Sequence, residues 1–470
     1  MTFEWSKYQL AIFDNIANGT SKTTFIEATA GSSKTTSLLE GLNYIPRGKK
    51  SLLVAFNKKI ADELKKRAPK SFEGEISTLH SLGLKSLGKT FRTKVNPERS
   101  MDIIKKIIGE DREKSELRYC LSRAVSMAKN TLSLTEKEID NIIDDYDLDY
   151  PNEIFRDIFI KLVIKVMEEC KASPEEIDFD SMIYLPNVLN VKVPKYDYVF
   201  LDEYQDVNFA QLELLKQTRS DNTRMFLFGD QMQNIYSFRA ADPRNIIQMK
   251  QELNAHSLPL SISYRCPIKV VKEAQKFVKE MEWAPNAPEG IVEKITLNEM
   301  KKRAQPGCFI ISRVNAPLIG LALHFIGQGI PANIQGRDLA TNLQNLIKKS
   351  RVKNIDKFLM WLDNWSKKEI DRIKEKEGNP EQIMDKVECL KVLAEGCKDT
   401  KDLIANIKKI FSDDLSAKVI LLGSTHALKG AEADQVFVLD WTYKYFNQEE
   451  KNIRFVAITR AKKELYLVSK

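Results

Sequence analysis

The chain has 470 residues, 43% of them hydrophobic and 29% charged, and a formal net charge of +8. This length exceeds what one hydrophobic core fills, so we expect an ordinary globular protein of more than one domain. No apolar run approaches the roughly 20 residues that span a bilayer, and the six cysteines and four histidines lack metal or disulfide spacing. We expect a cytoplasmic protein with no membrane partner, whose mild positive charge suits a polyanion or an evenly solvated surface.

Short apolar segments typical of strands fall in two blocks, and helical stretches separate them. The predicted strands span residues 24–30, 51–57, 199–202 and 225–229 in the first block, and 308–313, 419–423, 435–439 and 464–468 in the second. Strands that alternate with helices predict parallel sheets covered on both faces. Residues 100–170 and 343–411 show apolar residues at helical spacing instead. We predict an α/β protein with two parallel-sheet domains and helical insertions.

The first predicted strand leads into a small-residue loop and then an apolar helix. A strand, such a loop, Lys-Thr and a helix are together typical of a phosphate-binding loop. Its N–H groups and the helix N-terminus would hold phosphate, Lys34 would reach the β- and γ-phosphates, and Thr35 would bind Mg²⁺. Ser33 stands where the pattern has glycine, which lets phosphate approach the backbone. A plain turn stays open as the alternative. The expected nucleotide-binding residues are Ala30, Gly31, Ser32, Ser33, Lys34, Thr35 and Thr36.

Two adjacent carboxylates, Asp202 and Glu203, end the buried strand at residues 199–202. Parallel sheets place their chemistry at the carboxyl ends of their strands. One carboxylate can hold Mg²⁺ and the other can orient or deprotonate a water, as nucleotide hydrolysis requires. A solvated turn is the alternative for this pair alone.

A series of further motifs extends over nearly the whole chain. In order they are KYQLAIF, GSSKTT, LLVAFNKKIADELKKR, ISTLHSLGLK, EIDFDSMI, DEYQD, FGDQMQNIYSFRAAD, SISYRCP, GSTHALKGAEADQVFVLD and FVAITRAKKELYLV. In this order they resemble the motifs of the UvrD/Rep/PcrA-like superfamily 1 (SF1A) DNA helicases.

The resemblance implies two RecA-like domains of the P-loop NTPase class with ATP between them. Domain 1A would comprise residues 1–92 and 176–256, with insertion 1B at 93–175. Domain 2A would comprise residues 257–340 and 416–470, with a short insertion 2B at 341–415. We expect a compact version of the family, without a tail domain or a fused nuclease.

The resemblance also assigns roles in ATP binding and hydrolysis. The implied catalytic residues are Lys34, Asp202, Glu203, Gln233, Arg265 and Arg460. Gln233 would sense the γ-phosphate, and the two arginines would stabilise its transition-state charge. Gln9 and Tyr264 would hold adenine, and Glu432 would meet the sugar. Thr36 stands where the family often has arginine, so base selectivity is expected to be looser. The implied cofactors are ATP and Mg²⁺, the metal being held by Thr35 and Asp202.

A second implied group binds single-stranded nucleic acid, which needs phosphate contacts and aromatic rings for base stacking. Its residues are Phe56, Asn57, Thr78, His80, Tyr236, Phe238, Arg239, Thr425 and His426. Phe238 stands where many members have tryptophan. Core packing is the alternative for each aromatic residue, and an ordinary turn for either histidine.

The resemblance therefore implies an ATP-dependent helicase or translocase on single-stranded DNA, with 3′–5′ polarity typical of the family. We expect a monomer that acts at junctions of single- and double-stranded DNA, in the nucleoid or a host cytoplasm. A separate nuclease, repair or replication partner is left open. Two alternatives also stay open: a nucleic-acid-binding scaffold whose catalysis is weakened by Ser33, and an RNA-directed helicase.

Overall fold

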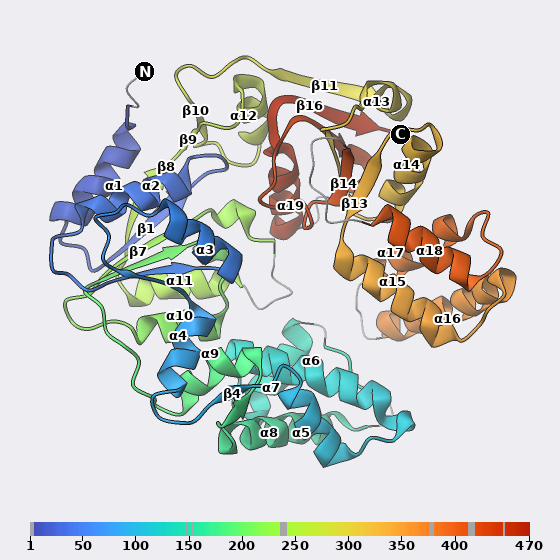
Figure 1. Cartoon of the computed structure of the whole chain (residues 1–470), viewed down its shortest axis with the longest axis horizontal. Coiled ribbons are helices and arrows are strands. Elements are labelled where there is room, and N and C mark those ends of the chain that lie inside the picture. The colour runs from blue at the N-terminus through green and yellow to red at the C-terminus, as the bar shows by residue number, and fades with distance from the viewer. Residues whose placement is uncertain are drawn as a thin grey trace. The chain divides into compact units, whose positions relative to one another are not determined.

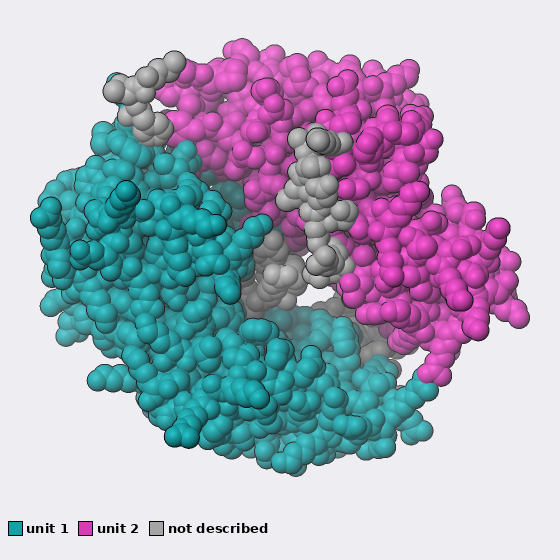
Figure 2. All heavy atoms as spheres, in the orientation of Figure 1, with its two compact units in different colours: residues 1–29, 33–261 teal, residues 30–32, 262–470 magenta. Residues whose placement is uncertain are grey.

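The computed structural model describes residues 4–146, 148–151, 154–235, 242–375, 380–411, 419–444 and 447–470. The chain divides into two compact units, which Figure 2 colours separately. Unit 1 contains Met1–Thr29 and Ser33–Ser261, and unit 2 contains Ala30–Ser32 and Ile262–Lys470.

Unit 1 is built on a six-stranded sheet in the order β3-β2-β6-β7-β1-β8, in which every neighbouring pair is parallel. β7 therefore lies beside β1, and β6 lies beside β7, although both are far from β1 in sequence. The strands are β1 Thr23–Ala28, β2 Ser51–Ala55, β3 Glu75–Thr78, β6 Tyr198–Asp202, β7 Arg224–Gly229 and β8 His256–Leu260.

Both faces of this sheet are buried, as its continuous apolar strands require. Alternate residues of β6 enter two separate cores: Val199 and Leu201 join one, and Tyr198 and Phe200 join the other. The helices that accompany the strands are α1 Lys7–Asn18, α2 Lys34–Gly41, α3 Lys58–Arg67, α4 Leu79–Leu87, α9 Phe179–Val188, α10 Phe209–Lys216 and α11 Pro243–Glu252.

A helical insertion with its own apolar core extends from unit 1 between α4 and α9 (Figure 1). Its helices are α5 Arg99–Ile108, α6 Ser115–Thr131, α7 Glu136–Asp145 and α8 Arg156–Ala172. Two short parallel strands, β4 Lys94–Val95 and β5 Glu176–Ile177, pair where it begins and ends. Two residues are too few to show strand alternation in the sequence.

Unit 2 contains a second six-stranded parallel sheet, in the order β11-β16-β15-β12-β14-β13. Its strands are β11 Ile291–Thr296, β12 Phe309–Ser312, β13 Ala332–Gln335, β14 Ile420–Ser424, β15 Ala433–Leu439 and β16 Ala461–Ser469. A separate two-stranded sheet pairs β9 Ile262–Ser263 with β10 Glu282–Trp283.

The helices of unit 2 include a group inserted between β13 and β14 (Figure 1). This group consists of α15 Arg337–Ser350, α16 Ile355–Glu375, α17 Glu381–Ala394 and α18 Thr400–Ile410, and it shares one continuous core with the sheet. The remaining helices are α12 Ile268–Ala274, α13 Leu297–Arg303, α14 Ala316–Gly327 and α19 Gln448–Ile458.

The predicted α/β fold with parallel sheets is confirmed, and each of the eight predicted strands is present with small shifts at its ends. The sequence prediction missed four strands of the two large sheets: β3, β8, β11 and β13. Each is an edge strand of its sheet. Edge strands are often short or polar because one side lacks a strand partner, which weakens the apolar signal.

Candidate functional site

The predicted phosphate loop connects β1 to α2 in a tight path. Gly31 has φ of +74°, and a Cβ there would lie 2.5 Å from Cβ of Arg265. Ser33 immediately precedes α2 and has φ 59° and ψ 35°, the left-handed region that favours glycine. The substitution of serine for glycine therefore leaves the backbone turn in place.

Two neighbours of this turn bear on nucleotide binding. Ser32 is 1% exposed, and its hydroxyl has no hydrogen-bond partner among the described residues. A buried hydroxyl without a partner is costly unless a ligand or water satisfies it. Ala30 is fully buried, whereas Thr36 is partly exposed at the first turn of α2. The loop thus offers a hydroxyl and a helix N-terminus suited to an anion.

Lys34 and Thr35, the first residues of α2, face the two carboxylates after β6. The Lys34 ammonium forms an ion pair with Glu203. The Thr35 hydroxyl lies 3.5 Å from Oδ2 of Asp202, to which it donates. The structure therefore brings these four predicted residues together, although more than 160 residues separate the loop from the carboxylates.

A third carboxylate, that of the buried Asp230, joins this group and was missed by the sequence analysis. It follows β7, the strand between β6 and β1, and is 3% exposed. The Gln233 side chain donates to Asp230 at 2.8 Å. Gln205 connects the two strand ends, since its amide donates to Glu203 at 2.5 Å and accepts the backbone N–H of Asp230 at 3.0 Å. In the sequence Asp230 directly follows an apolar strand, within FGDQMQ.

Burial and mutual charge shift the protonation of this cluster. Burial, reinforced by the neighbouring Glu203, raises the pKa of Asp202 to about 7. Burial also raises the pKa of Asp230 to about 6, against the Gln233 hydrogen bond that lowers it. For Lys34 burial lowers the pKa, but Glu203, Asp202 and Asp230 outweigh this and leave it raised. The lysine therefore stays charged in a buried setting, as phosphate binding requires.

The oxygens of Thr35 and Asp202 fit a Mg²⁺ ion that keeps several waters and takes phosphate oxygens as further ligands. No group of three or more His, Cys, Asp or Glu residues within the described ranges is arranged to hold a metal by itself.

The predicted adenine residue Gln9 is fully buried at the start of α1. Its side chain accepts from Ser6 in a capping box and donates to Ser37 of α2 at 2.9 Å. The Ser37 hydroxyl in turn donates to the carbonyl of Ser33 at 3.0 Å. Gln9 is thereby connected to the phosphate loop through two hydrogen bonds.

The other predicted nucleotide residues belong to unit 2. Tyr264 is 39% exposed, and its N–H donates to the carbonyl of Gly31 at 2.9 Å. Glu432, expected to meet the sugar, accepts from Arg265 at 2.5 Å. Arg460 is 1% exposed and donates to carbonyls of Val456 and Ala431. Both predicted arginines contact Thr459, so the structure brings them together.

Two pairs of predicted strand-contacting residues follow neighbouring strands of unit 1. Phe56 and Asn57 come directly after β2, and Thr78 ends β3 in register with Ala55. Asn57 and Thr78 cap α3 and α4 through their side chains. Burial lowers the pKa of the partly exposed His80, so this imidazole is neutral at neutral pH. The predicted Tyr236, Phe238 and Arg239 lie outside the described residues.

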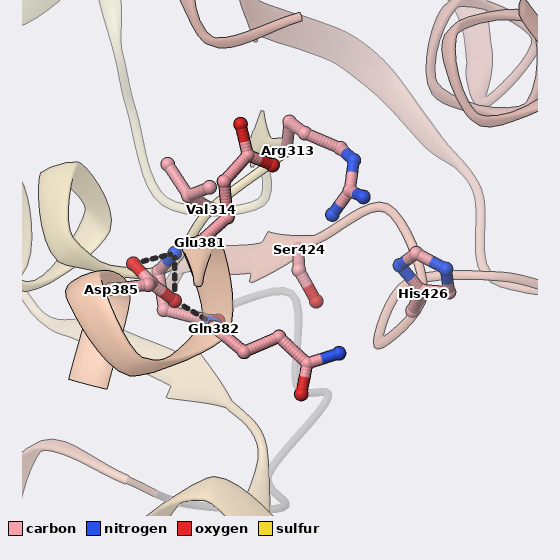
Figure 3. A pocket seen from close by; sticks show the side chains of 8 residues that line it. Arg313, Val314, Glu381, Gln382, Asp385, Ser424 and His426 are labelled. Carbon is pink, nitrogen blue, oxygen red and sulfur yellow. Dashed lines mark hydrogen bonds between the residues drawn. The ribbon is translucent and has the colours of Figure 1, made fainter. Parts of the chain in front are cut away.

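In unit 2, Thr425 is buried and its hydroxyl lies 2.8 Å from that of Tyr443. The adjacent His426 lines a polar cavity of about 200 Å³. Figure 3 shows its side chain near those of Arg313 and Ser424, with Gln382 reaching into the same space. The other lining residues are Val314, Asn315, Glu381 and Asp385.

The sequence analysis did not include Arg313, whose guanidinium donates to both carboxylate oxygens of Glu450, at 2.8 Å to Oε1 and 3.1 Å to Oε2. The Asp385 carboxylate accepts hydrogen bonds from the N–H groups of Asn315 and Ala316, and so fixes the segment between Arg313 and α14. These contacts join residues 69 to 137 positions apart, so sequence spacing carries no sign of them.

Residues 11–254 match the UvrD/REP helicase N-terminal domain, which is more than half of the chain, and residues 420–468 match the UvrD-like helicase C-terminal domain. The chain belongs to the UvrD/Rep helicase family. The resemblance inferred from the motifs is thereby confirmed.

Individual members of the UvrD/Rep helicase family show the same likeness. The chain is 29% identical to the ATP-dependent DNA helicase PcrA of Bacillus subtilis, over 54% of this chain and 37% of that protein. It is 26% identical to the ATP-dependent DNA helicase Rep of Buchnera aphidicola subsp. Schizaphis graminum, over 84% of this chain and 69% of that protein. The match to this chain spans little more than a third of the length of the Bacillus subtilis PcrA. Among the described helices, none has the length and apolar character to cross a bilayer.

Proposed function

We propose that this chain is an ATP-dependent helicase or translocase that moves along single-stranded DNA in the 3′–5′ direction. One observation carries the proposal. At the carboxyl ends of the unit 1 strands, the structure brings together Lys34, Thr35, Asp202 and Glu203. Membership of the UvrD/Rep helicase family supports the choice of DNA and ATP as substrates.

The residues of the cluster have distinct proposed roles. Lys34 neutralises the β- and γ-phosphates, and Glu203, held by Gln205, orients or deprotonates the attacking water. Thr35 and Asp202 hold Mg²⁺, which would neutralise charge on the phosphates. Gln233, hydrogen-bonded to Asp230, responds to the γ-phosphate.

The remaining predicted residues stay proposals assigned by motif position. Arg265 and Arg460 stabilise the transition-state charge, Gln9 and Tyr264 hold adenine, and Glu432 contacts the sugar. The strand-contacting residues bind phosphates and stack bases without reading their sequence. We further propose a cytoplasmic monomer acting at single- and double-strand junctions, and the domain division 1A, 1B, 2A and 2B at the boundaries predicted from the sequence.

ATP hydrolysis with and without single-stranded DNA tests the proposal. We expect strong stimulation by an oligo(dT) strand and its complete loss in Lys34→Ala. Lys216→Ala is a matched control, because Lys216 also forms ion pairs with two carboxylates of unit 1 but lies outside the cluster. A wild-type rate no higher than that of Lys34→Ala, with strand binding intact, would make the chain a binding scaffold instead.

Polarity and substrate class need their own measurement. Duplexes with a 3′ or a 5′ single-stranded tail are compared for ATP-driven strand separation, beside the same tails made of RNA. We expect unwinding only from the 3′ DNA tail. Unwinding from the 5′ tail would refute the polarity, and preference for the RNA tail would refute the DNA assignment.

A further inference from the structure

A connected set of polar side chains runs through unit 1 from the turn after β6. This turn starts at Glu203, forms one 3-10 turn over Tyr204–Asp206, and ends at Asn208, the N-cap of α10. The N–H of Asp206 donates to the carbonyl of Glu203 at 3.0 Å. Asn208 is fixed by two hydrogen bonds with Gln211, each 2.9 Å long. The turn is therefore a short hydrogen-bonded segment between Glu203 and Asn208.

Asn208 then contacts the helical insertion. Its side-chain amide donates to Oδ1 of Asn130, in α6, at 2.7 Å. The amide of Asn130 donates to Oδ1 of Asp180, in α9, at 3.3 Å. The other oxygen of this carboxylate accepts the hydroxyl of Ser126 at 2.5 Å. The insertion thus supplies the middle of a hydrogen-bonded path between two helices of the sheet domain.

The far end of the path reaches α4, the helix that carries His80. The backbones of α4 and α9 are in direct contact, because a Cβ on Gly83 would lie 1.9 Å from the carbonyl oxygen of Met182. His80 precedes Gly83 by three residues and so shares its face of the helix. Burial lowers the pKa of His80, and the carboxylate of Asp180 acts in the opposite direction by its negative charge. The effect of burial is the larger of the two.

We propose that Asn130 and Asp180 are positioning residues. They connect the turn that contains Glu203 to α4, the helix that Thr78 caps and that contains His80. Through them, binding of a single strand at α4 alters the placement of the hydrolytic carboxylate. The inference rests on the proposed function and adds a role for the insertion, which would convey strand binding to the ATP site.

A purely structural role for this path is not needed to join α6 to α9, because these two helices already have a separate anchor. The fully buried ammonium of Lys129 donates to Ser100 at 2.7 Å, to Asp178 at 2.8 Å and to Ser181 at 2.8 Å. All three of its protons are used, and α5, α6 and α9 are held together by it. Asn130 is therefore not required to attach the insertion.

The test compares two asparagine variants in the full chain. Asn130→Ala removes the bridge between Asn208 and Asp180. Asn187→Ala is the matched control, since its amide also joins α9 to α10 by donating to the carbonyl of Ala210 at 2.9 Å, but no hydrogen bond joins it to Asn130 or Asp180. Each variant is assayed for ATP hydrolysis without DNA, its stimulation by oligo(dT), and its thermal midpoint.

We expect Asn130→Ala to lower the stimulation by oligo(dT) by about fivefold or more, the lower end of coupling between two sites. Its rate without DNA should stay near that of the wild type. Asn187→Ala should lower the thermal midpoint comparably while retaining the stimulation. Equal losses of stimulation in both variants, or none in Asn130→Ala, would overturn the inference. Neither result would touch the proposed function, which fails only if the wild type itself is not stimulated.

An exchange of groups gives an independent readout. Asn130→Asp alone places two carboxylates against each other and should lose stimulation. Combined with Asp180→Asn, the new carboxylate can accept from Asn208 and from the new amide, whose oxygen can accept from Ser126, so the three hydrogen bonds of the path can re-form. The hydrogen bond from Asn130 to the carbonyl of Ser126, 2.9 Å long, is lost in both the single and the double variant. We expect the double variant to recover most of the stimulation. Failure to recover in a variant with the wild-type thermal midpoint would refute positioning through these hydrogen bonds.

Discussion

Replacing Ser33 by glycine should stabilise unit 1, although serine is the native residue. Ser33 has φ 59° and ψ 35°, and its side chain makes no capping hydrogen bond to α2. The left-handed region costs a residue with a Cβ about 1–2 kcal/mol. Glycine removes this cost but adds about 0.5–1 kcal/mol of flexibility to the unfolded chain. The balance is a gain of about 0.5–1 kcal/mol.

For a domain of this size class, about 1 kcal/mol corresponds to a shift of about 2–4 °C in the thermal midpoint. We therefore expect Ser33→Gly to raise the midpoint of unit 1 by about 1–4 °C in calorimetry. Ser33→Ala is the control, because it removes the hydroxyl but keeps a Cβ in the left-handed region. It should leave the midpoint unchanged or lower it slightly.

The two variants separate the backbone from the hydroxyl. If Ser33→Ala stabilised unit 1 as much as Ser33→Gly, the hydroxyl and not the backbone angle would be the source of strain. If Ser33→Gly gave no increase, the cost of the left-handed conformation would be no larger than the flexibility that glycine adds to the unfolded chain. Either result would refute the account of the phosphate loop given above.

Three further outcomes follow from the structure. Gly83→Ala should lower stability by about 1–3 kcal/mol, because the added Cβ would meet the backbone of Met182. Gly320→Ala is the control: its added Cβ lies in open space on α14 and should raise stability by about 1 kcal/mol. Chemical denaturation measures both changes. Because burial raises the pKa of Asp202 to about 7, the contribution of this carboxyl group to stability should fall as pH rises from about 4 to about 7. Asp202→Asn should therefore be more stable than the wild type at pH 8, and the two free energies of unfolding from urea titrations should converge near pH 4. A difference in free energy that stayed constant with pH would refute the raised pKa of Asp202. Asp385→Ala leaves the first N–H groups of α14 without their cap, so stability should fall by about 1–2 kcal/mol and the thermal midpoint should fall with it. The affinity for oligo(dT) should also fall.

The interior strands could be predicted from the sequence because they are continuous apolar runs, such as Tyr198–Asp202, in which every residue is buried. The edge strands could not. β8 contains Pro259 and is mostly exposed, and β11 alternates weakly, with exposed Glu293 and Lys294. Their position at a sheet edge is a property of the tertiary fold, which local periodicity does not contain.

The same limit applies to the site. The motifs pointed to Lys34 and to Asp202 with Glu203, because these residues end or follow apolar strands. Asp230 was missed because a single aspartate after a strand resembles any polar turn. Its place in the cluster follows from the strand order, which puts β7 between β6 and β1. Spacing along the chain does not reveal that order.

Two positions that break local rules in unit 1 lie at the proposed chemistry, whereas a third, Leu132 with φ of 53°, ends α6. Ser33 and Glu203 both have φ near 60°, an uncommon angle for residues other than glycine and asparagine. Ser33 immediately precedes Lys34, and Glu203 forms the ion pair with that lysine. Each residue therefore accepts an unfavourable backbone angle at the point where a charged side chain is aimed into the cluster. Local strain that persists on both sides of one ion pair is expected where geometry serves function rather than stability.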